Sequence, residues 1–216
     1  MKENKIFVNF HEMKEETHAK IFPIVFDSLS INEKEKVQKF KNANDRYLSA
    51  ISKYMIKKIF QNLQIPGENY IQIKFNKYGK PFVDSDFFFN VSHSERLIVC
   101  AFTKTDHVGI DIEYVKPINI TDFIDVLTST EQHLLNSSAD VLDAFYELWT
   151  QKESILKASG TGLSVSPKMI KICNNVGYGL EREWHLHKID VHPSYWCTIA
   201  SPIKNPEIVL SEFCSF

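Results

Sequence analysis

Two acidic residues stand two positions apart in the segment Gly109–Glu113 (GIDIE), where Asp111 and Glu113 alternate with isoleucines. If this segment is a strand, the two carboxylates share one face and the apolar side chains share the other, with Gly109 leaving room beside the carboxylates. Carboxylates held so close repel each other unless a cation lies between them, and hard oxygen ligands suit Mg²⁺. An ordinary amphipathic strand with a solvated face gives the same spacing, so both interpretations stand at this point.

A second group of reactive residue types lies about forty residues further along. Trp149, Glu153 and Lys157 are spaced i, i+4, and therefore form one row on a predicted helix over residues 139–158. Such a Glu/Lys pair is usually a surface salt bridge worth a few tenths of a kcal/mol. Because the helix ends at the glycine-containing loop 159–162, the same pair could instead present a carboxylate and an ammonium to one bound phosphate.

Small polar residues, Ser92-His93-Ser94, separate two apolar stretches that have the length of buried strands. They predict either a turn capped by hydroxyl groups or a site where hydroxyl, imidazole and backbone N–H groups bind an anion. No GxSxG sequence is present, which argues against a serine hydrolase.

Residues 31–80 hold 11 Lys and Arg against 4 Asp and Glu. This excess is typical of a solvated face and could also attract phosphate groups.

The composition is that of a globular protein. With 216 residues, 44% of them hydrophobic and 24% charged, the chain is neither disordered nor collagen-like. Four scattered cysteines without a CxxC pair, and the lack of a signal peptide, predict a cytoplasmic protein without disulfides. No apolar run reaches the roughly 18 residues of a membrane span. A net charge of −2 argues against a dedicated nucleic-acid binder, so neither a membrane nor a nucleic acid is an expected partner.

Hydrophobic periodicity predicts the elements that would position these residues. Pro66-Gly67 would end the first long helix, which follows a strand and a shorter charged helix. The predicted helices cover residues 32–41, 44–63 and 139–158. The predicted strands cover residues 5–10, 70–75, 87–91, 97–102 and 107–115, with further strands in the last fifty residues.

The order of helices followed by strands occurs twice. At an ungapped offset of 99 residues, segments 44–60 and 93–113 overlay 143–159 and 192–212 with seven identities in 38 positions, where about two are expected by chance. This predicts an α+β fold of two similar halves, residues 1–107 and 108–216, with a cleft between them. The first half is basic and the second acidic.

The motifs follow one another in a fixed order: Gly79-Lys80-Pro81, then Phe89–Ser94 (FNVSHS), then Gly109–Glu113, then Trp149–Lys157 (WTQKESILK). This order and spacing resemble the 4′-phosphopantetheinyl transferases of the Sfp type, whose signature is a GxDxE strand followed about forty residues later by a W-x-x-K-E-x-x-x-K helix. The resemblance runs from about residue 34 to 165. The last ~50 residues carry no matching motif.

The resemblance implies a pseudo-two-fold pair of α/β halves in one chain, and hence a pseudo-dimeric monomer. It also implies an activity: transfer of the 4′-phosphopantetheine arm of coenzyme A to a serine of an acyl or peptidyl carrier protein, with release of adenosine 3′,5′-bisphosphate. Mg²⁺, with Mn²⁺ as a substitute, would be the cofactor, and coenzyme A the co-substrate. Carriers of fatty acid, polyketide, nonribosomal peptide and lysine synthesis all stay open as partners.

The resemblance further implies roles for single residues. Asp111, Glu113 and Glu153 would bind the metal, and Glu153 would act as base directly or through water. Lys157 would contact the pyrophosphate and stabilise or protonate the leaving group, so Asp111, Glu153 and Lys157 are the implied catalytic residues. The other implied contacts to coenzyme A are Lys152 beside Lys157, Ser92 and His93 at a phosphate, Lys80 and Pro81 at the adenine, and Arg46 with Lys34 or Lys36 at the 3′-phosphate.

Two other functions fit parts of the sequence. Residues 31–80 could form a surface for nucleic acid or another polyanion, with the carboxylates simply solvated. Such binding would weaken steeply with salt and need no Mg²⁺. A degenerate, non-catalytic member would bind only coenzyme A or a carrier, but the intact set of Asp111, Glu113, Glu153 and Lys157 argues against it.

Overall fold

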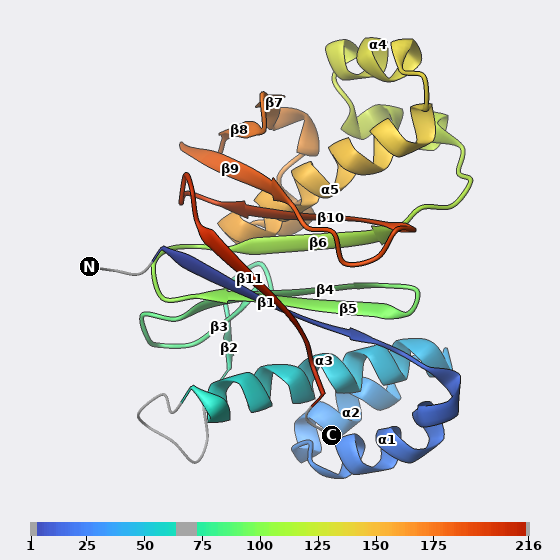
Figure 1. The fold of residues 1–216 in the computed structure, drawn as a ribbon, viewed down its shortest axis with the longest axis vertical. Helices are drawn as coiled ribbons and strands as arrows, with labels where there is room; N and C mark the ends of the chain where they lie inside the picture. Colours follow the sequence, from blue (N-terminus) through green and yellow to red (C-terminus); the bar gives the residue numbers. More distant parts are fainter. Residues whose placement is uncertain (1–3, 64–72, 215–216) are drawn as a thin grey trace.

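The computed structural model describes residues 4–63 and 73–214 (Figure 1). The first part of the chain forms β1 (Lys5–Glu12), α1 (Glu15–Asp27), α2 (Ile31–Gln38), α3 (Ala43–Asn62), β2 (Lys74–Phe75), β3 (Pro81–Phe82), β4 (Phe88–Ser94) and β5 (Leu97–Thr103). Within the described ranges, no helix is long and apolar enough to cross a membrane.

The second part begins at β6 and adds the remaining elements, which are β6 (Gly109–Tyr114), η1 (Ile120–Val126), α4 (Ser129–Ser137), α5 (Val141–Ser159), η2 (Gly162–Ser164), η3 (Pro167–Met169), β7 (Lys171–Cys173), β8 (Val176–Gly179), β9 (Arg182–Lys188), β10 (Tyr195–Ser201) and β11 (Glu207–Glu212). The predicted α+β class is confirmed.

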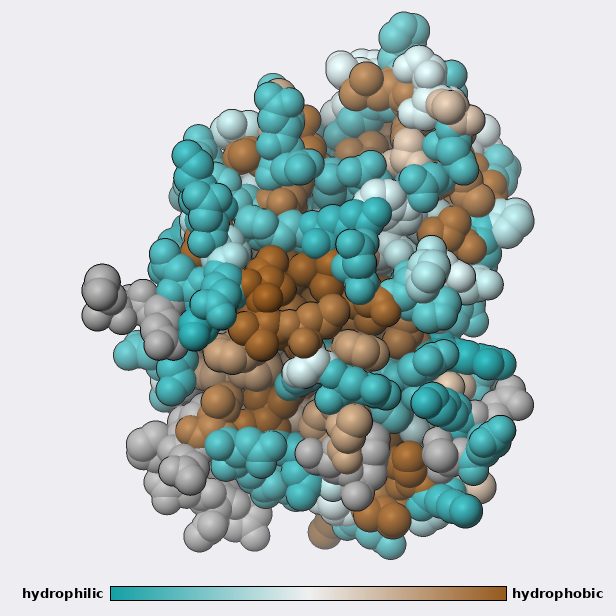
Figure 2. Space-filling model, in the orientation of Figure 1, coloured by the Kyte–Doolittle hydropathy of each residue, from teal (hydrophilic) through white to brown (hydrophobic). Residues whose placement is uncertain are grey.

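Two sheets lie face to face between layers of helices. The first has the strand order β11-β1-β5-β4 and the second β6-β10-β9-β8-β7. Figure 1 shows α1, α2 and α3 outside the first sheet and α5 outside the second. The layer between the sheets is apolar and includes Ile6, Val8, Ile110, Ile112 and Ile199. Figure 2 shows apolar side chains gathered across the middle of the molecule, at the level of the two sheets.

The same order of elements recurs along the chain. A strand, short helices, a long helix and a pair of antiparallel strands occur once as β1 to β5 and again as β6 to β10. The starts of β5 and β10 are 98 residues apart, close to the repeat offset read from the sequence. The pseudo-two-fold relation itself stays a prediction. β11 belongs to the predicted second half in sequence, yet it pairs in parallel with β1 and completes the first sheet.

One local prediction is wrong, one helix is not predicted, and one predicted strand lies partly outside the described residues. Ser92-His93-Ser94 belong to β4 itself, and the turn is formed by Glu95 and Arg96, with Glu95 at a positive φ of 50°. The sequence signals do not predict α1, because this helix lacks a side-chain N-cap and contains Pro23. Of the strand predicted over 70–75, Lys74–Phe75 is a strand, while residues 70–72 and the stop signal Pro66-Gly67 lie outside the described residues.

The helix α5 lies directly against β6 at Gly109. A Cβ atom on Gly109 would overlap the carbonyl oxygen of Ser154 and the backbone of Ala158. The room beside the carboxylates, which the sequence predicts at this glycine, is therefore filled by the backbone of α5. The helix is fixed at both ends, since Asp140 accepts a hydrogen bond from the Asp143 N–H and Gly160 closes the last turn at a φ of 77°.

Gly109→Ala should destabilise the protein, because the added methyl group must push α5 away from β6. Overpacking of this kind costs about 2 kcal/mol, and the melting temperature of a chain this long should fall by roughly 4 to 8 °C. Thermal unfolding followed by circular dichroism measures the change. An unchanged melting temperature would show that α5 does not need this close approach.

Candidate active site

Asp111 is the most deeply buried of the predicted site residues on β6. It is 2% exposed, on the face of the strand that points away from the apolar layer between the sheets. Its Oδ1 accepts a hydrogen bond of 2.6 Å from the Lys157 ammonium and one of 3.0 Å from the Ser92 hydroxyl. Lys157 also donates to the Ser92 Oγ at 2.8 Å. A carboxylate, an ammonium and a hydroxyl from β6, α5 and β4 therefore meet at one point.

Glu113 follows two residues later on the same face of β6. The Ser94 hydroxyl donates to its Oε2 at 2.8 Å. Burial raises the pKa of the Glu113 carboxyl, the charge of Asp111 raises it further, and hydrogen bonds from Ser94 and the Trp149 side chain act in the opposite direction. The predicted arrangement of two carboxylates on one strand face is thus present, and each is held by a serine of β4.

Glu153 joins these carboxylates from α5. Burial, with the negative charge of Asp111 adding to it, raises the pKa of the Glu153 carboxyl to about 7. Two buried oxygens at this site, Glu153 Oε1 and Asp111 Oδ2, have no hydrogen-bond partner among the described residues. Buried polar atoms are normally paired, so these two oxygens indicate a place where a ligand supplies the missing contacts.

Mg²⁺ fits this set of donors. Within the described part of the chain, no group of three or more His, Cys, Asp or Glu side chains is arranged as a ready-made metal site. Mg²⁺ does not require one, because it is usually held by one or two carboxylates together with substrate phosphates and waters. The unpartnered oxygens of Asp111 and Glu153 are hard ligands of the required kind.

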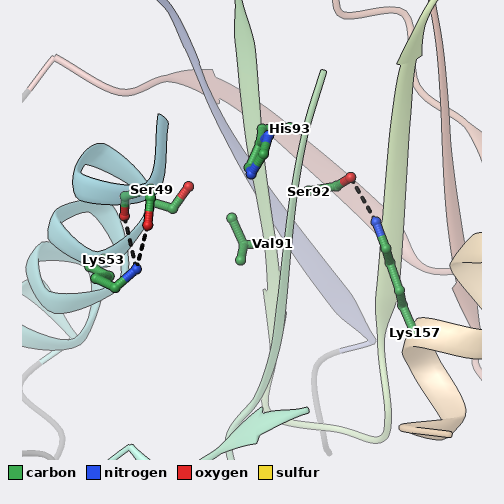
Figure 3. Close-up of a pocket in the computed structure, with 7 residues that line it drawn as sticks. Ser49, Lys53, Val91, Ser92, His93 and Lys157 are labelled. Atoms are coloured by element: carbon green, nitrogen blue, oxygen red, sulfur yellow. Dashed lines mark hydrogen bonds between the residues drawn. The ribbon is translucent and has the colours of Figure 1, made fainter. Parts of the chain in front are cut away.

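A pocket of about 330 Å³ opens next to the carboxylates, between α3, β4 and α5 (Figure 3). Its lining contains two lysines, one histidine, hydroxyl groups and no carboxylate: Ser49, Ser52, Lys53, Val91, Ser92, His93 and Lys157. In Figure 3, Lys53 lies on the α3 side and Lys157 on the opposite side, with β4 between them. This charge distribution favours an anion in the pocket.

The electrostatics of the pocket support that interpretation. Burial lowers the pKa of the Lys53 ammonium, whose Nζ donates to the Oγ of Ser49 at 2.8 Å and to its carbonyl oxygen at 3.2 Å. His93 is exposed, yet partial desolvation by the surrounding groups lowers the pKa of its imidazole, and the positive charge of Lys157 lowers this pKa further. A bound anion would relieve this repulsion between cationic groups.

The sequence signals do not single out Ser49, Ser52 and Lys53 as site residues. Lys53 is one of many lysines in the basic run 31–80, and nothing in the local pattern separates it from its neighbours. The ungapped repeat, which places Lys53 opposite Lys152, marks both lysines but does not indicate their surroundings. The lining of the pocket depends on the approach of α3 to β4, which is a tertiary contact.

Lys80 is directed at backbone carbonyl groups. Its Nζ donates to Ala158 O at 2.8 Å and to Val108 O at 3.3 Å, while Asn76 of the same turn donates to Gly160 O at 2.8 Å. Burial lowers the pKa of the Lys80 ammonium to about 8. The turn 76–80 therefore joins the end of α5 to the start of β6. Pro81 follows it as the half-buried first residue of β3.

The three predicted contacts to the 3′-phosphate lie outside the pocket lining. Arg46 is half-buried, and its guanidinium donates to Phe40 O at 3.4 Å. The Lys34 ammonium lies 4.0 Å from Asp27, and the Lys36 ammonium lies 4.6 Å from the centre of the Phe75 ring.

Lys152 does not join Lys157. Its side chain is fully buried, with its ammonium 2.8 Å from Glu131 Oε1 of α4 and donating to the carbonyl oxygens of Pro167 and Ile170 at 2.9 and 3.2 Å. Burial lowers the pKa of the Lys152 ammonium, while Glu131 raises it. Lys152 thus ties α5 to α4 and η3. The two lysines differ because residues five positions apart on a helix lie on different faces.

Lys152→Met should destabilise the protein by about 3 to 5 kcal/mol, because Glu131 then stays buried without a counter-charge. The double variant Lys152→Met/Glu131→Leu should recover most of this loss. Denaturant unfolding measures both changes, with Lys168→Met at an exposed lysine as the control. If Lys152→Met were as stable as this control, the buried pair of Lys152 and Glu131 would not contribute to the stability of the fold.

Comparisons with known proteins agree with the geometry. Residues 107–206 match the 4′-phosphopantetheinyl transferase superfamily, and residues 16–105 match the family described as 4′-phosphopantetheinyl transferase, N-terminal. The chain is 43% identical to the 4′-phosphopantetheinyl transferase gsp of Aneurinibacillus migulanus over 148 residues, or 65% of this chain and 62% of the relative.

Two further relatives extend the comparison. The chain is 31% identical to the 4′-phosphopantetheinyl transferase Sfp of Bacillus subtilis over 63% of this chain and 62% of the relative, so it spans about three fifths of both bacterial proteins. It is also 31% identical to the L-aminoadipate-semialdehyde dehydrogenase-phosphopantetheinyl transferase of Mus musculus, over 83% of this chain and 68% of the relative. The resemblance predicted from the motifs is confirmed, and the chain belongs to the 4′-phosphopantetheinyl transferase superfamily, among the transferases of the Sfp type.

Proposed function

We propose that this protein transfers the 4′-phosphopantetheine arm of coenzyme A to a serine of an acyl or peptidyl carrier protein and releases adenosine 3′,5′-bisphosphate, with Mg²⁺ as cofactor. One observation carries the proposal. Two unpartnered carboxylate oxygens, on Asp111 and Glu153, lie beside a pocket that is lined by the ammonium groups of Lys53 and Lys157 and by the imidazole of His93. A metal–pyrophosphate substrate needs both kinds of surface side by side.

Asp111, Glu113 and Glu153 would hold the metal, with Asp111 and Glu113 on one face of β6 and Glu153 on α5. When bound, Mg²⁺ would neutralise the charge that develops on the pyrophosphate oxygens. Lys157 donates to Asp111 and to Ser92, and therefore stands at the boundary between the carboxylates and the pocket. Its ammonium would bind a non-bridging or bridging oxygen of the pyrophosphate and stabilise the charge of the leaving group.

The proposed transfer step is a displacement at the β-phosphorus of coenzyme A. The serine Oγ of the carrier forms a bond to the β-phosphorus of coenzyme A, and the bond from that phosphorus to the bridging oxygen breaks. Glu153, directly or through one water, accepts the serine proton. The departing adenosine 3′,5′-bisphosphate keeps the electron pair of the broken bond, with the Lys157 ammonium beside it. A base is needed because a neutral serine hydroxyl is a weak nucleophile, and a carboxylate within hydrogen-bond reach can serve as one.

The pocket lined by Lys53, His93 and Lys157 would bind a further phosphate of coenzyme A. Lys53 and His93 lie on its α3 side, and Ser92 with Lys157 connects it to the reaction centre. Arg46, with Lys34 or Lys36, stays a candidate contact for the 3′-phosphate outside the pocket. Lys80 and Pro81 stay candidate neighbours of the adenine, and Lys152 takes a structural role in this proposal.

Glu153→Gln should abolish most of the transfer, because an amide neither accepts the serine proton nor ligates Mg²⁺ as a carboxylate does. Loss of a general base typically lowers the rate about 10² to 10⁴-fold. The assay mixes apo carrier proteins from several pathways with coenzyme A, Mg²⁺ and enzyme, and follows by mass spectrometry the addition of one phosphopantetheine group. Chelation of the metal should stop the wild-type reaction, and added Mg²⁺ should restore it.

Glu147→Gln is the matched control, since Glu147 lies on the same helix and its carboxylate interacts with Gln151 instead of the site. It should transfer at the wild-type rate. If folded wild-type protein modified none of the carriers, or if Glu153→Gln retained full turnover, the proposed reaction or the proposed base would be wrong.

Lys53→Met should raise the KM for coenzyme A about tenfold or more and leave kcat less affected. The loss of a hydrogen bond to a charged phosphate, typically about 1.5 to 3 kcal/mol, accounts for this change. Lys58→Met removes the same charge from the same helix, at a lysine that lies over the Tyr54 ring outside the pocket, and should leave the KM unchanged. Equal effects of the two variants would indicate only a general loss of positive charge.

A further inference from the structure

The strands β4 and β6 belong to different sheets, yet they are joined by a regular row of hydrogen bonds. Three backbone N–H groups of β6 donate to side chains of β4. Ile110 N donates to Asn90 Oδ1 at 2.9 Å, Ile112 N to Ser92 Oγ at 3.4 Å, and Tyr114 N to Ser94 Oγ at 3.1 Å. We call this row the β4–β6 seam. Each bond links residues 20 positions apart, so both strands advance by two residues from one bond to the next.

The seam solves a problem of the β6 backbone. β6 pairs with β10 on one side and is an edge strand on the other. Unpaired N–H groups at a buried edge are costly, and a neighbouring strand normally accepts them. Here side-chain oxygens of β4 accept these hydrogen bonds in place of a strand backbone, and Asn90 and Ser92 are only 5% and 6% exposed. This explains why small polar side chains occupy alternate positions at the end of β4, at Asn90, Ser92 and Ser94.

The two serines of the seam also hold the carboxylates. Ser92 Oγ donates to Asp111 Oδ1 at 3.0 Å, and Ser94 Oγ donates to Glu113 Oε2 at 2.8 Å. In both cases the serine accepts from one β6 residue and donates to the residue before it. A hydroxyl can do both because it is one donor with two acceptor positions. Among the described residues, Asn90 makes no side-chain bond besides the one of the seam, and the matching β6 residue is Gly109, which has no side chain.

We propose that Ser94 is a positioning residue, which aims the Glu113 carboxylate at the metal while its seam bond keeps β6 at a set distance from β4. The positioning role of Ser94 rests on the proposed function, since that function assigns the metal to these carboxylates. The hydrogen bonds of the seam do not depend on the proposed function. Partners of this kind, which orient a ligand without touching the ion, commonly change metal affinity 10- to 100-fold when removed.

Ser94 and Asn90 form a matched pair that separates positioning from cohesion. Ser94→Ala removes one seam bond and the bond to Glu113, whereas Asn90→Ala removes a seam bond alone. Ser94→Thr keeps the hydroxyl and suits a strand. Ser94 is half-buried whereas Asn90 is buried, so Ser94→Ala should destabilise the fold less than Asn90→Ala.

Two measurements on the full chain test the proposal. The first is amide hydrogen exchange, in which the Tyr114 amide should exchange about fivefold or more faster in Ser94→Ala than in wild type, and the Ile110 amide correspondingly faster in Asn90→Ala. The second is Mn²⁺ titration in the presence of coenzyme A, followed by the electron paramagnetic resonance of the free ion. Ser94→Ala should bind Mn²⁺ about tenfold more weakly, and Asn90→Ala and Ser94→Thr should stay within about twofold of wild type.

The outcomes divide cleanly. Wild-type Mn²⁺ affinity in Ser94→Ala, or an equal loss in Asn90→Ala, would overturn the positioning role, as would a lack of Mn²⁺ binding by the wild type. An unchanged Tyr114 exchange rate in Ser94→Ala would overturn the seam. The carrier assay judges the proposed function separately, because neither measurement here involves a carrier. An intact seam with an inactive wild type would therefore count against the transferase reaction alone.

Discussion

The buried carboxylate of Asp111 is the constraint on which the site depends. An ionised group that is 2% exposed must be compensated, because an uncompensated buried charge costs several kcal/mol. The compensation comes from the Lys157 ammonium at 2.6 Å and the Ser92 hydroxyl at 3.0 Å. These partners belong to α5 and β4, so the charge is tolerated only when β6 has a helix on one side and the strand of another sheet on the other.

Both faces of β6 serve this arrangement. Ile110 and Ile112 anchor the strand in the apolar layer between the sheets, and Asp111 and Glu113 on the other face bond to Lys157, Ser92 and Ser94. Gly109 lets the backbone of α5 come close enough for Lys157 to reach Asp111. Ser92 of β4 lies at the boundary between two kinds of surface. Its hydroxyl bonds to the carboxylate of Asp111, and it also lines the pocket that contains Lys53 and Lys157. A polyphosphate and its metal would lie across that change of charge.

Chemically similar residues take different roles here because of their surroundings. Lys53 and Lys152 occupy matching places in the sequence repeat, but Lys53 lines the anion pocket while Lys152 is enclosed with Glu131. Lys80 likewise closes the junction of α5 and β6 with its ammonium on carbonyl groups. Residue type and motif position are the same kind of information in each case. Only the packing of the long helices tells a ligand contact from a structural tie.

The sequence by itself determined the local part of this protein: the alternation that places Asp111 and Glu113 on one face, the helical row of Glu153 and Lys157, the glycine end of α5 and the α+β class. Such features repeat within a few residues and follow from backbone geometry. The tertiary structure alone decided that Ser92 and Ser94 belong to a strand, that Lys53 lines the pocket, that Lys152 is buried away from it, and that β11 completes the first sheet. These outcomes depend on contacts between residues far apart in the sequence, such as Ser94 with Tyr114 and Lys5 with Glu207, and no local period encodes such a pairing.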